Sequence, residues 1–394
     1  MAVHSIAAAD ILDEERFQTG RVVTIAGSHA VHDTYTAFLP SLLPVFIANL
    51  SLSTTGAGLL QVFIQWPSLL QPLIGHLADR VSLRYLVILA PAVTGIMMSL
   101  LGIAPSYAVL AMLLIVAGLS SASIHAVAPV MAGRLSGRSL GRGMGYWMVG
   151  GELGRTLGPI VIVTAIRLLT LEGTPWLMIG GLLASIMLYL RLRDVPGRPL
   201  EPDRGLPWRE ALGGTRSIVM PLVGITVVRA FVVAALATYL PTFLTREGVN
   251  LWLAGAALSV FQIGGVIGAL VAGSVSDRLG RGRVLLVSMV ATSLLMFVFM
   301  SITGWFQFPV LLALGFTSLS AVPVLMALVQ ESFPENRALA NGVFMAVTFV
   351  IQSGAVVIMG VVGDLFGLRL AYTASAVILL AGVPLVLLLP ARAK

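Results

Sequence analysis

The chain has 394 residues, of which 58% are hydrophobic and only 10% are charged, and its mean hydropathy is +0.98. Soluble domains carry roughly 25% charged residues, so this composition excludes a soluble globular protein. There is no cysteine, which excludes disulfides and thiolate metal sites. The net charge of +7 comes from arginines between apolar segments, so we expect membrane lipid headgroups as the anionic partner, and no nucleic acid.

The first twenty residues are predicted to form an N-terminal cytoplasmic segment, 1–20. A signal peptide needs a basic start followed by an apolar core, and this segment has neither. It instead carries acidic side chains at Asp10, Asp13, Glu14 and Glu15. We expect a short amphipathic segment on the cytoplasmic face of the membrane.

Apolar runs of about 20 residues, each long enough to cross a bilayer core of roughly 30 Å, then recur along the whole chain. They predict an all-α membrane protein with twelve transmembrane helices. The predicted spans are 21–48, 56–78, 85–104, 107–131, 144–168, 174–192, 217–244, 252–276, 284–304, 307–330, 338–363 and 369–390.

Arginines are distributed unequally between alternate loops. One set of loops holds Arg80, Arg84, Arg134, Arg138, Arg142, the arginines of 191–216, Arg278, Arg281, Arg283 and Arg337. The opposite set holds only Arg167, Arg246 and Arg369. Basic loops stay in the cytoplasm, so we expect both termini there, in a multi-pass protein of the bacterial inner (plasma) membrane.

The two halves of the chain resemble each other. A polar stretch rich in proline, glycine and charge, 193–216, predicts a cytoplasmic linker between an N-terminal six-helix bundle, 21–192, and a C-terminal one, 217–394. "TAFLPSLL" at 36–43 matches "ATYLPTFL" at 237–244, and "GHLADR" at 75–80 matches "GSVSDR" at 273–278. Many transporters are built from such repeats around a site at the membrane midplane.

The two copies of "GxxxDR" resemble the loop between the second and third spans of the major facilitator superfamily. The residues that carry the resemblance are Gly75, Asp79, Arg80 and Arg84 in the first copy and Gly273, Asp277, Arg278 and Arg281 in the second. The resemblance implies two pseudo-symmetric bundles, alternating access, a gating role for these residues and a monomer. Ordinary interfacial charges are the alternative.

The fifth predicted span, "GYWMVGGELGRTLGPIV", is similar to the antiporter motif of drug exporters in that superfamily. Gly145, Gly154, Gly158 and Pro159 fit its spacing, whereas the Gly pair that ends the motif is absent from 160–163. A glycine-rich packing face without directional meaning is the alternative. "HAVHDTYTAFLPSLLP", "SLLQPLIGHLADR" and "GLSSASIHAVAP" resemble the fosmidomycin-resistance group of drug-efflux transporters.

Charged side chains inside spans are costly and usually face the bundle interior or a wet cavity. His29 and Asp33 are four residues apart on one helix face, with His32 beside them. We predict that Asp33, His29 and His32 bind and release the coupling proton, with Glu152 as a second candidate. A structural hydrogen-bond network is the alternative for the histidine cluster, and a structural pair with Arg155 is the alternative for Glu152.

Arg229 has no acidic residue within one turn of its own helix, so we predict that it binds an anionic cargo. A tether between Arg229 and Asp33 is the alternative. The resemblance implies that spans one, four, five, seven and ten line the cavity. Further candidate cargo-binding residues are Arg155, His125, Tyr35, Gln65, Gln262 and Gln352.

Several functions are disfavoured by what the sequence lacks. No phosphate-binding loop occurs and the only lysine is Lys394, so we expect no ATP site, no enzymatic activity and no cofactor. We expect no metal site. His29, His32 and Asp33 are residue types that can bind a metal cargo, but nothing else in the sequence supports one. The predicted function is proton-coupled export of a small organic, amphipathic or anionic, compound. The alternatives are proton-coupled uptake of an organic anion or sugar derivative, and a non-transporting sensor or scaffold.

Overall fold

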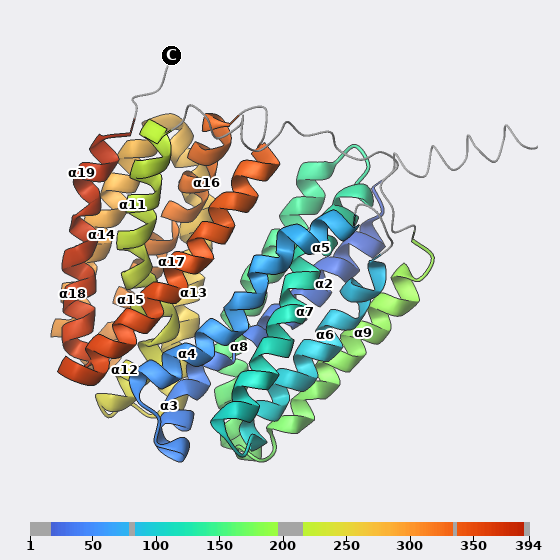
Figure 1. Ribbon diagram of the computed structural model, residues 1–394, viewed down its shortest axis with the longest axis horizontal. Helices are drawn as coiled ribbons and strands as arrows, with labels where there is room; N and C mark the ends of the chain where they lie inside the picture. The colour runs from blue at the N-terminus through green and yellow to red at the C-terminus, as the bar shows by residue number, and fades with distance from the viewer. Residues whose placement is uncertain (1–16, 79–82, 196–215, 334–336, 390–394) are drawn as a thin grey trace, which may run out of the picture. The chain divides into compact units, whose positions relative to one another are not determined.

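The computed structural model describes residues 17–78, 83–195, 216–333 and 337–389. Its described residues are helical or in connecting turns (Figure 1). Within them, ten helices are long and apolar enough to cross a membrane. These ten correspond to the third to twelfth predicted spans. Most of segment 1–20 and of linker 193–216 lies outside the described residues.

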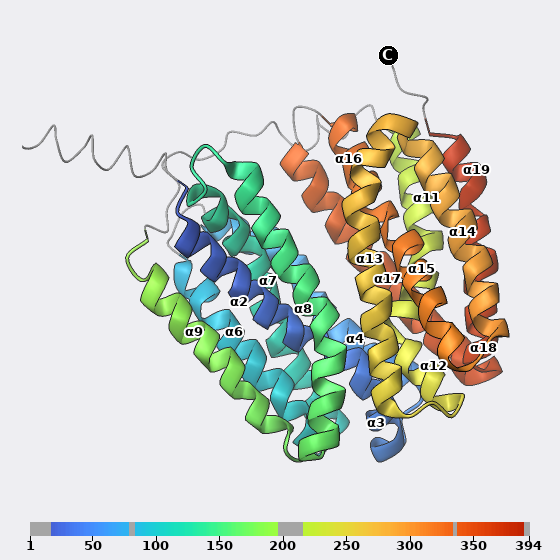
Figure 2. The same cartoon turned by 180° about the vertical axis from the view of Figure 1, so that it is seen from behind.

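The first compact unit contains Met1–Phe38 and Trp66–Pro202. In it α6 packs against both α7 and α9 (Figure 1), and α2 packs along α8 (Figure 2). Its helices are α2 (Thr19–Thr36), η1 (Trp66–Leu70), α5 (Gln71–Ala78), α6 (Arg84–Ser99), η2 (Leu100–Ile103), α7 (Tyr107–Arg134), α8 (Leu140–Leu169), η3 (Thr174–Leu177) and α9 (Met178–Leu192).

The second compact unit contains Leu39–Gln65 and Asp203–Lys394, so a segment of the first half of the chain packs with the second half. In this unit α13 and α14 pack against α15, and α17 packs against α4 (Figure 1). Its helices are α3 (Leu39–Leu50), α4 (Thr54–Gln65), α11 (Arg216–Val233), η4 (Ala234–Thr238), α12 (Leu240–Arg246), α13 (Leu251–Leu279), α14 (Arg281–Ser301), η5 (Gly304–Phe306), α15 (Gln307–Leu319), α16 (Ala321–Ser332), α17 (Arg337–Phe366), α18 (Leu368–Leu380) and α19 (Gly382–Leu387).

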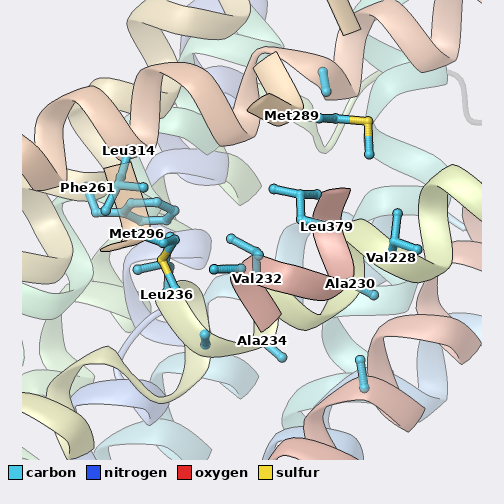
Figure 3. Close-up of a cluster of buried hydrophobic side chains, with 14 of the residues drawn as sticks. Val228, Ala230, Val232, Ala234, Leu236, Phe261, Met289, Met296, Leu314 and Leu379 are labelled. Atoms are coloured by element: carbon cyan, nitrogen blue, oxygen red, sulfur yellow. The ribbon is translucent and has the colours of Figure 1, made fainter. Parts of the chain in front are cut away.

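The core of the second unit includes buried apolar side chains from α11, α13, α14, α15 and α18. Figure 3 shows part of this cluster, with Val232, Phe261, Met289 and Leu379 among the labelled side chains. Burying such side chains provides about 25 cal/mol per Å² of apolar surface removed from a polar solvent. In a membrane, close packing and internal hydrogen bonds contribute most of the helix–helix attraction.

Three predicted spans are interrupted. The second divides into α4, η1 and α5, and the first and seventh break at matching places in the repeat. The first span divides into α2 and α3 at Ala37 and Phe38, and the seventh passes through a π-helical turn, η4, before α12. Each new helix has a proline at its second position, Pro40 or Pro241. A proline has no N–H to continue the hydrogen-bond ladder, so the helix breaks at the same place in both copies of the repeat.

Candidate functional site

The close approach of α2 and α8 is possible because α8 has glycines on the facing side. A Cβ atom built on Gly150 or Gly154 would overlap the backbone of Ala26 or Ala30 on α2. A Cβ on Gly151 would lie 2.5 Å from His29 Cε1. The glycine spacing of the fifth span therefore has a local physical role: it makes room for the polar side chains of α2.

Three side chains from two helices meet in this unit. His29 and Asp33 come from α2 and His125 comes from α7. His29 Nε2 lies 3.2 Å from His125 Nε2 and 3.4 Å from Asp33 Oδ2, and His125 Nε2 lies 3.6 Å from Asp33 Oδ1. We call these three residues the His–Asp–His cluster.

The backbone fixes which nitrogen of each histidine carries hydrogen. His29 Nδ1 lies 2.9 Å from the carbonyl oxygen of Trp147, and His125 Nδ1 lies 2.9 Å from that of Ser121. A carbonyl oxygen only accepts, so both Nδ1 atoms must donate. In the neutral rings both Nε2 atoms then carry lone pairs. The indole of Trp147 stacks on the His29 ring at a centroid distance of 3.5 Å, which further fixes its orientation.

Three hydrogen-bond acceptors therefore face one another in the cluster: the Nε2 atoms of His29 and His125 and the carboxylate of Asp33. Two bare ring nitrogens and a carboxylate repel each other unless a cation lies between them. One added proton gives an N–H···N bond between the histidines and a positive charge beside Asp33. The three ligand atoms also lie within 4.8 Å of one another, a separation that a divalent metal ion can bridge.

The cluster is buried on one side and accessible on the other. The side chains of His29 and Asp33 are each 5% exposed, whereas that of His125 is 31% exposed. His125 is thus the most exposed of the three side chains. His32 is completely buried, its ring centroid lies 5.8 Å from that of His125, and neither ring nitrogen has a hydrogen-bond partner among the described residues.

The other predicted proton and cargo residues have separate surroundings. Glu152 and Arg155 form an ion pair on α8. The Tyr35 hydroxyl donates to the Leu177 carbonyl oxygen and accepts from Gly181 N–H. Gln65 Oε1 lies 3.5 Å from Ser353 Oγ. The last two predicted cargo residues lie half-buried on α13 and α17: Gln262 and Gln352.

Arg229 lies in the second unit and is 8% exposed. Its guanidinium donates to the Ser318 carbonyl oxygen on α15 at 2.6 Å. It also lines a small cavity between α11, α14, α15 and α18. Among the described residues, no carboxylate pairs with it.

The loop that contains the second copy of GxxxDR forms a charge network. Arg281, at the start of α14, lies 2.6 Å from an Asp277 carboxylate oxygen and 2.8 Å from one of Glu331 on α16. Gly273 and Arg278 lie on the same helix as Asp277, α13. In the first loop Gly75 lies on α5 and Arg84 donates to the Val195 carbonyl oxygen, while Asp79 and Arg80 fall outside the described residues.

One polar contact was not predicted from the sequence. The Asp364 carboxylate on α17 accepts the N–H of Thr54 at 2.6 Å and the N–H of Thr55 at 2.9 Å. Arg246 donates to Thr54 Oγ1 at 2.9 Å. A carboxylate at the first turn satisfies free N–H groups and interacts favourably with the helix dipole. Asp364 thereby joins α4, from the first half of the chain, to α17, from the second.

Comparison with known families agrees with these features. The model of the Major Facilitator Superfamily matches residues 25–312 and 253–394. The chain belongs to the Major Facilitator Superfamily. This confirms the resemblance that the two copies of GxxxDR predicted.

Two bacterial relatives match over nearly their full lengths. The chain is 23% identical over 386 residues to the fosmidomycin resistance protein of Escherichia coli (strain K12), covering 95% of this chain and 94% of that protein. It is 25% identical over 392 residues to the uncharacterized MFS-type transporter YfnC of Bacillus subtilis (strain 168), covering 95% and 93%.

Solved transporter structures share the fold. A bacterial homologue of the human lysosomal transporter Spinster, inward-facing and occupied, superposes with a TM-score of 0.79 at 16% identity, covering 94% of this chain and 96% of that one. The nucleoside transporter NupG superposes with a TM-score of 0.71 at 15% identity, covering 93% and 98%. Family and fold together indicate a multi-pass membrane transporter.

Proposed function

We propose that this transporter exports a small organic compound, amphipathic or anionic, in exchange for protons by alternating access. It would act in the bacterial inner membrane with both termini in the cytoplasm, the side indicated by the basic loops. The E. coli relative is named for resistance to fosmidomycin, which favours export over uptake.

The His–Asp–His cluster is the observation that carries the proposal of proton coupling. Its two Nε2 atoms are 3.2 Å apart, and backbone carbonyls hold both Nδ1 atoms as donors. The cluster without a proton has a charge of −1 and three mutually repelling acceptors. With one proton it is neutral and internally hydrogen-bonded, so it favours loading a single proton.

The proton changes the helix contacts as well as the charge. Asp33 and His29 lie against the glycines of α8, and His125 lies on α7. Loading or releasing the proton therefore strengthens or weakens the attraction between α2 and α7 in the same unit. Such a two-state contact is what an exchanger needs to link protonation to alternating access. His32 and Glu152 are proposed as secondary proton-accepting residues, and Arg155 as a cargo contact beside the cluster.

The experiment is proton movement in proteoliposomes that contain a pH-sensitive dye. A pH gradient is imposed, and drugs, organic acids and sugar phosphates are added in turn. We expect a compound-dependent proton flux that Asp33→Asn abolishes while compound binding persists. Asp194→Asn is the matched control, because Asp194 is 75% exposed and pairs only with its neighbour Arg193 among the residues described.

The other outcomes separate the alternatives. Movement of protons and compound in the same direction across the membrane would indicate uptake by symport and contradict export by exchange. Flux that needs Zn²⁺ or another divalent ion in place of a gradient would assign the cluster to a metal cargo. Binding without any flux would indicate a sensor or scaffold.

A further inference from the structure

The buried charge of Arg229 needs an explanation that the cluster in the first unit does not provide. Arg229 is 8% exposed. Among the described residues, its guanidinium donates one hydrogen bond, to the Ser318 carbonyl oxygen at 2.6 Å. An arginine is always ionised, so its charge cannot be removed by losing a proton. A buried charge of this kind requires a counterion.

The described carboxylates of the second unit are all engaged elsewhere. Glu247 pairs with Arg369, Asp277 and Glu331 both pair with Arg281, and Asp364 binds the backbone of Thr54 and Thr55. The counterion of Arg229 is thus not supplied by these side chains.

The cavity beside Arg229 offers hydrogen-bond donors in an apolar setting. Ser318 Oγ is buried and has no partner among the described residues, so it is free to donate. The hydroxyls of Ser288 and Thr292 are already used on Thr317. Val232, Met289 and Leu379 form the apolar walls, and Figure 3 shows these three side chains within the core cluster.

A guanidinium has five N–H donors, and only one bond to the protein is described for Arg229. Unused N–H groups and a free hydroxyl favour an anion over a cation. A water molecule would accept hydrogen bonds but leave the charge uncompensated. The cavity has a volume of about 10 Å³, about the minimum for one water molecule, so only a small occupant fits.

We propose that Arg229 and Ser318 bind a small inorganic anion, of about the size of chloride, inside the second unit. The anion is the resident counterion of Arg229 and stabilises the packing of α11 on α15. The acidic group of an anionic cargo could bind Arg229 in the same way, and binding such a cargo is the role expected for Arg229 from the sequence. The size of the cavity favours the free anion.

The test measures the thermal unfolding temperature, Tm, of the purified protein in detergent. Chloride or bromide replaces gluconate at constant ionic strength, because gluconate is too large for the cavity. We expect a saturable rise in Tm with either halide, absent in Arg229→Gln. In Ser318→Ala the half-saturating concentration should rise about tenfold, the effect of losing one hydrogen bond to a charged group. Arg283→Gln removes an exposed arginine of α14 and should leave the rise unchanged.

If Arg229→Gln does not fold, Ser318→Ala and the anomalous scattering of bromide in crystals still decide the question. Bromide beside Arg229 would support the proposal. An unchanged Tm in halide, or the same rise in Ser318→Ala as in the wild type, would overturn it. A rise with organic acids alone, lost in Arg229→Gln, would overturn the resident anion and assign Arg229 to the cargo. These measurements do not depend on proton flux, so a negative result for the anion would leave the proposed proton exchange untested and intact.

Discussion

His29 and His125 face each other through their Nε2 atoms at 3.2 Å, and each ring is held at Nδ1 by a backbone carbonyl oxygen. Two neutral imidazoles in this arrangement cannot form a hydrogen bond with each other, because neither Nε2 carries hydrogen. The contact becomes attractive only when one proton is added. This geometry is the basis of our proposal that the pair, together with Asp33, binds a single proton.

Gly151→Ala is predicted to disrupt the cluster without removing any polar group. The added Cβ would lie 2.5 Å from His29 Cε1 and 2.9 Å from its Nε2. Displacing the ring should cost about 1–3 kcal/mol of stability, typical of overpacking, and should reduce proton flux. Gly145→Ala is the control on the same helix, because nothing lies within 4 Å of a Cβ at Gly145. Equal flux in both variants would contradict this account of the glycine face.

His125→Gln is predicted to abolish proton flux while leaving compound binding measurable. Glutamine offers a permanent N–H near Asp33, so the carboxylate is satisfied without a mobile proton. The measurement is dye-reported flux beside binding by tryptophan fluorescence. Retained flux with a wild-type pH dependence would exclude His125 from the coupling path.

The sequence predicted the part of the cluster that lies on one helix. His29 and Asp33 are four residues apart, so a shared face follows from helix geometry alone. From the sequence, His125 could join either this cluster or the cargo site, and the choice depends on how α7 packs against α2. The fixing of both Nδ1 atoms was equally inaccessible, because the acceptors are backbone carbonyls of Trp147 and Ser121, which no residue pattern identifies.

Asp364→Ala is predicted to weaken the attachment of α4 to α17. The change removes the acceptor of two backbone N–H groups at the start of α4, a loss of about 1–2 kcal/mol for a helix cap. The chain has no native cysteine, so Ala57→Cys gives a single probe on the buried face of α4. Thiol labelling at position 57 should be faster when Asp364 is alanine. An unchanged rate would show that the carboxylate does not hold α4.

Arg281→Ala is predicted to loosen the contact between α13, α14 and α16. The Arg281 side chain is 12% exposed and bridges two half-exposed carboxylates, so we expect a loss of about 1 kcal/mol after allowing for solvent screening. Thermal unfolding is the measurement, and Arg283→Ala, at an exposed position on α14, is the control. Equal Tm values for the two variants would contradict a structural role for the Arg281 network.

Sequence patterns predicted the helices more fully than their interruptions. The ten later spans are long apolar helices, whereas the first two divide into shorter pieces. Pro40 lies at the break in the first span and Pro241 at the π-helical turn in the seventh, where a proline cannot donate the next backbone hydrogen bond. Asp364 went unnoticed because its partners are more than 300 positions away, and only tertiary packing brings a carboxylate in α17 to the first turn of α4.

The number of protons released when a transported compound binds tests proton coupling through the His–Asp–His cluster directly. Purified protein in weakly buffered detergent solution is mixed with the compound, and a pH indicator reports proton release per protein. We predict one proton for the wild type and for Asp194→Asn, and none for Asp33→Asn or His125→Gln. The same proton release from all four proteins would contradict this prediction, because the proton would then come from outside the His–Asp–His cluster.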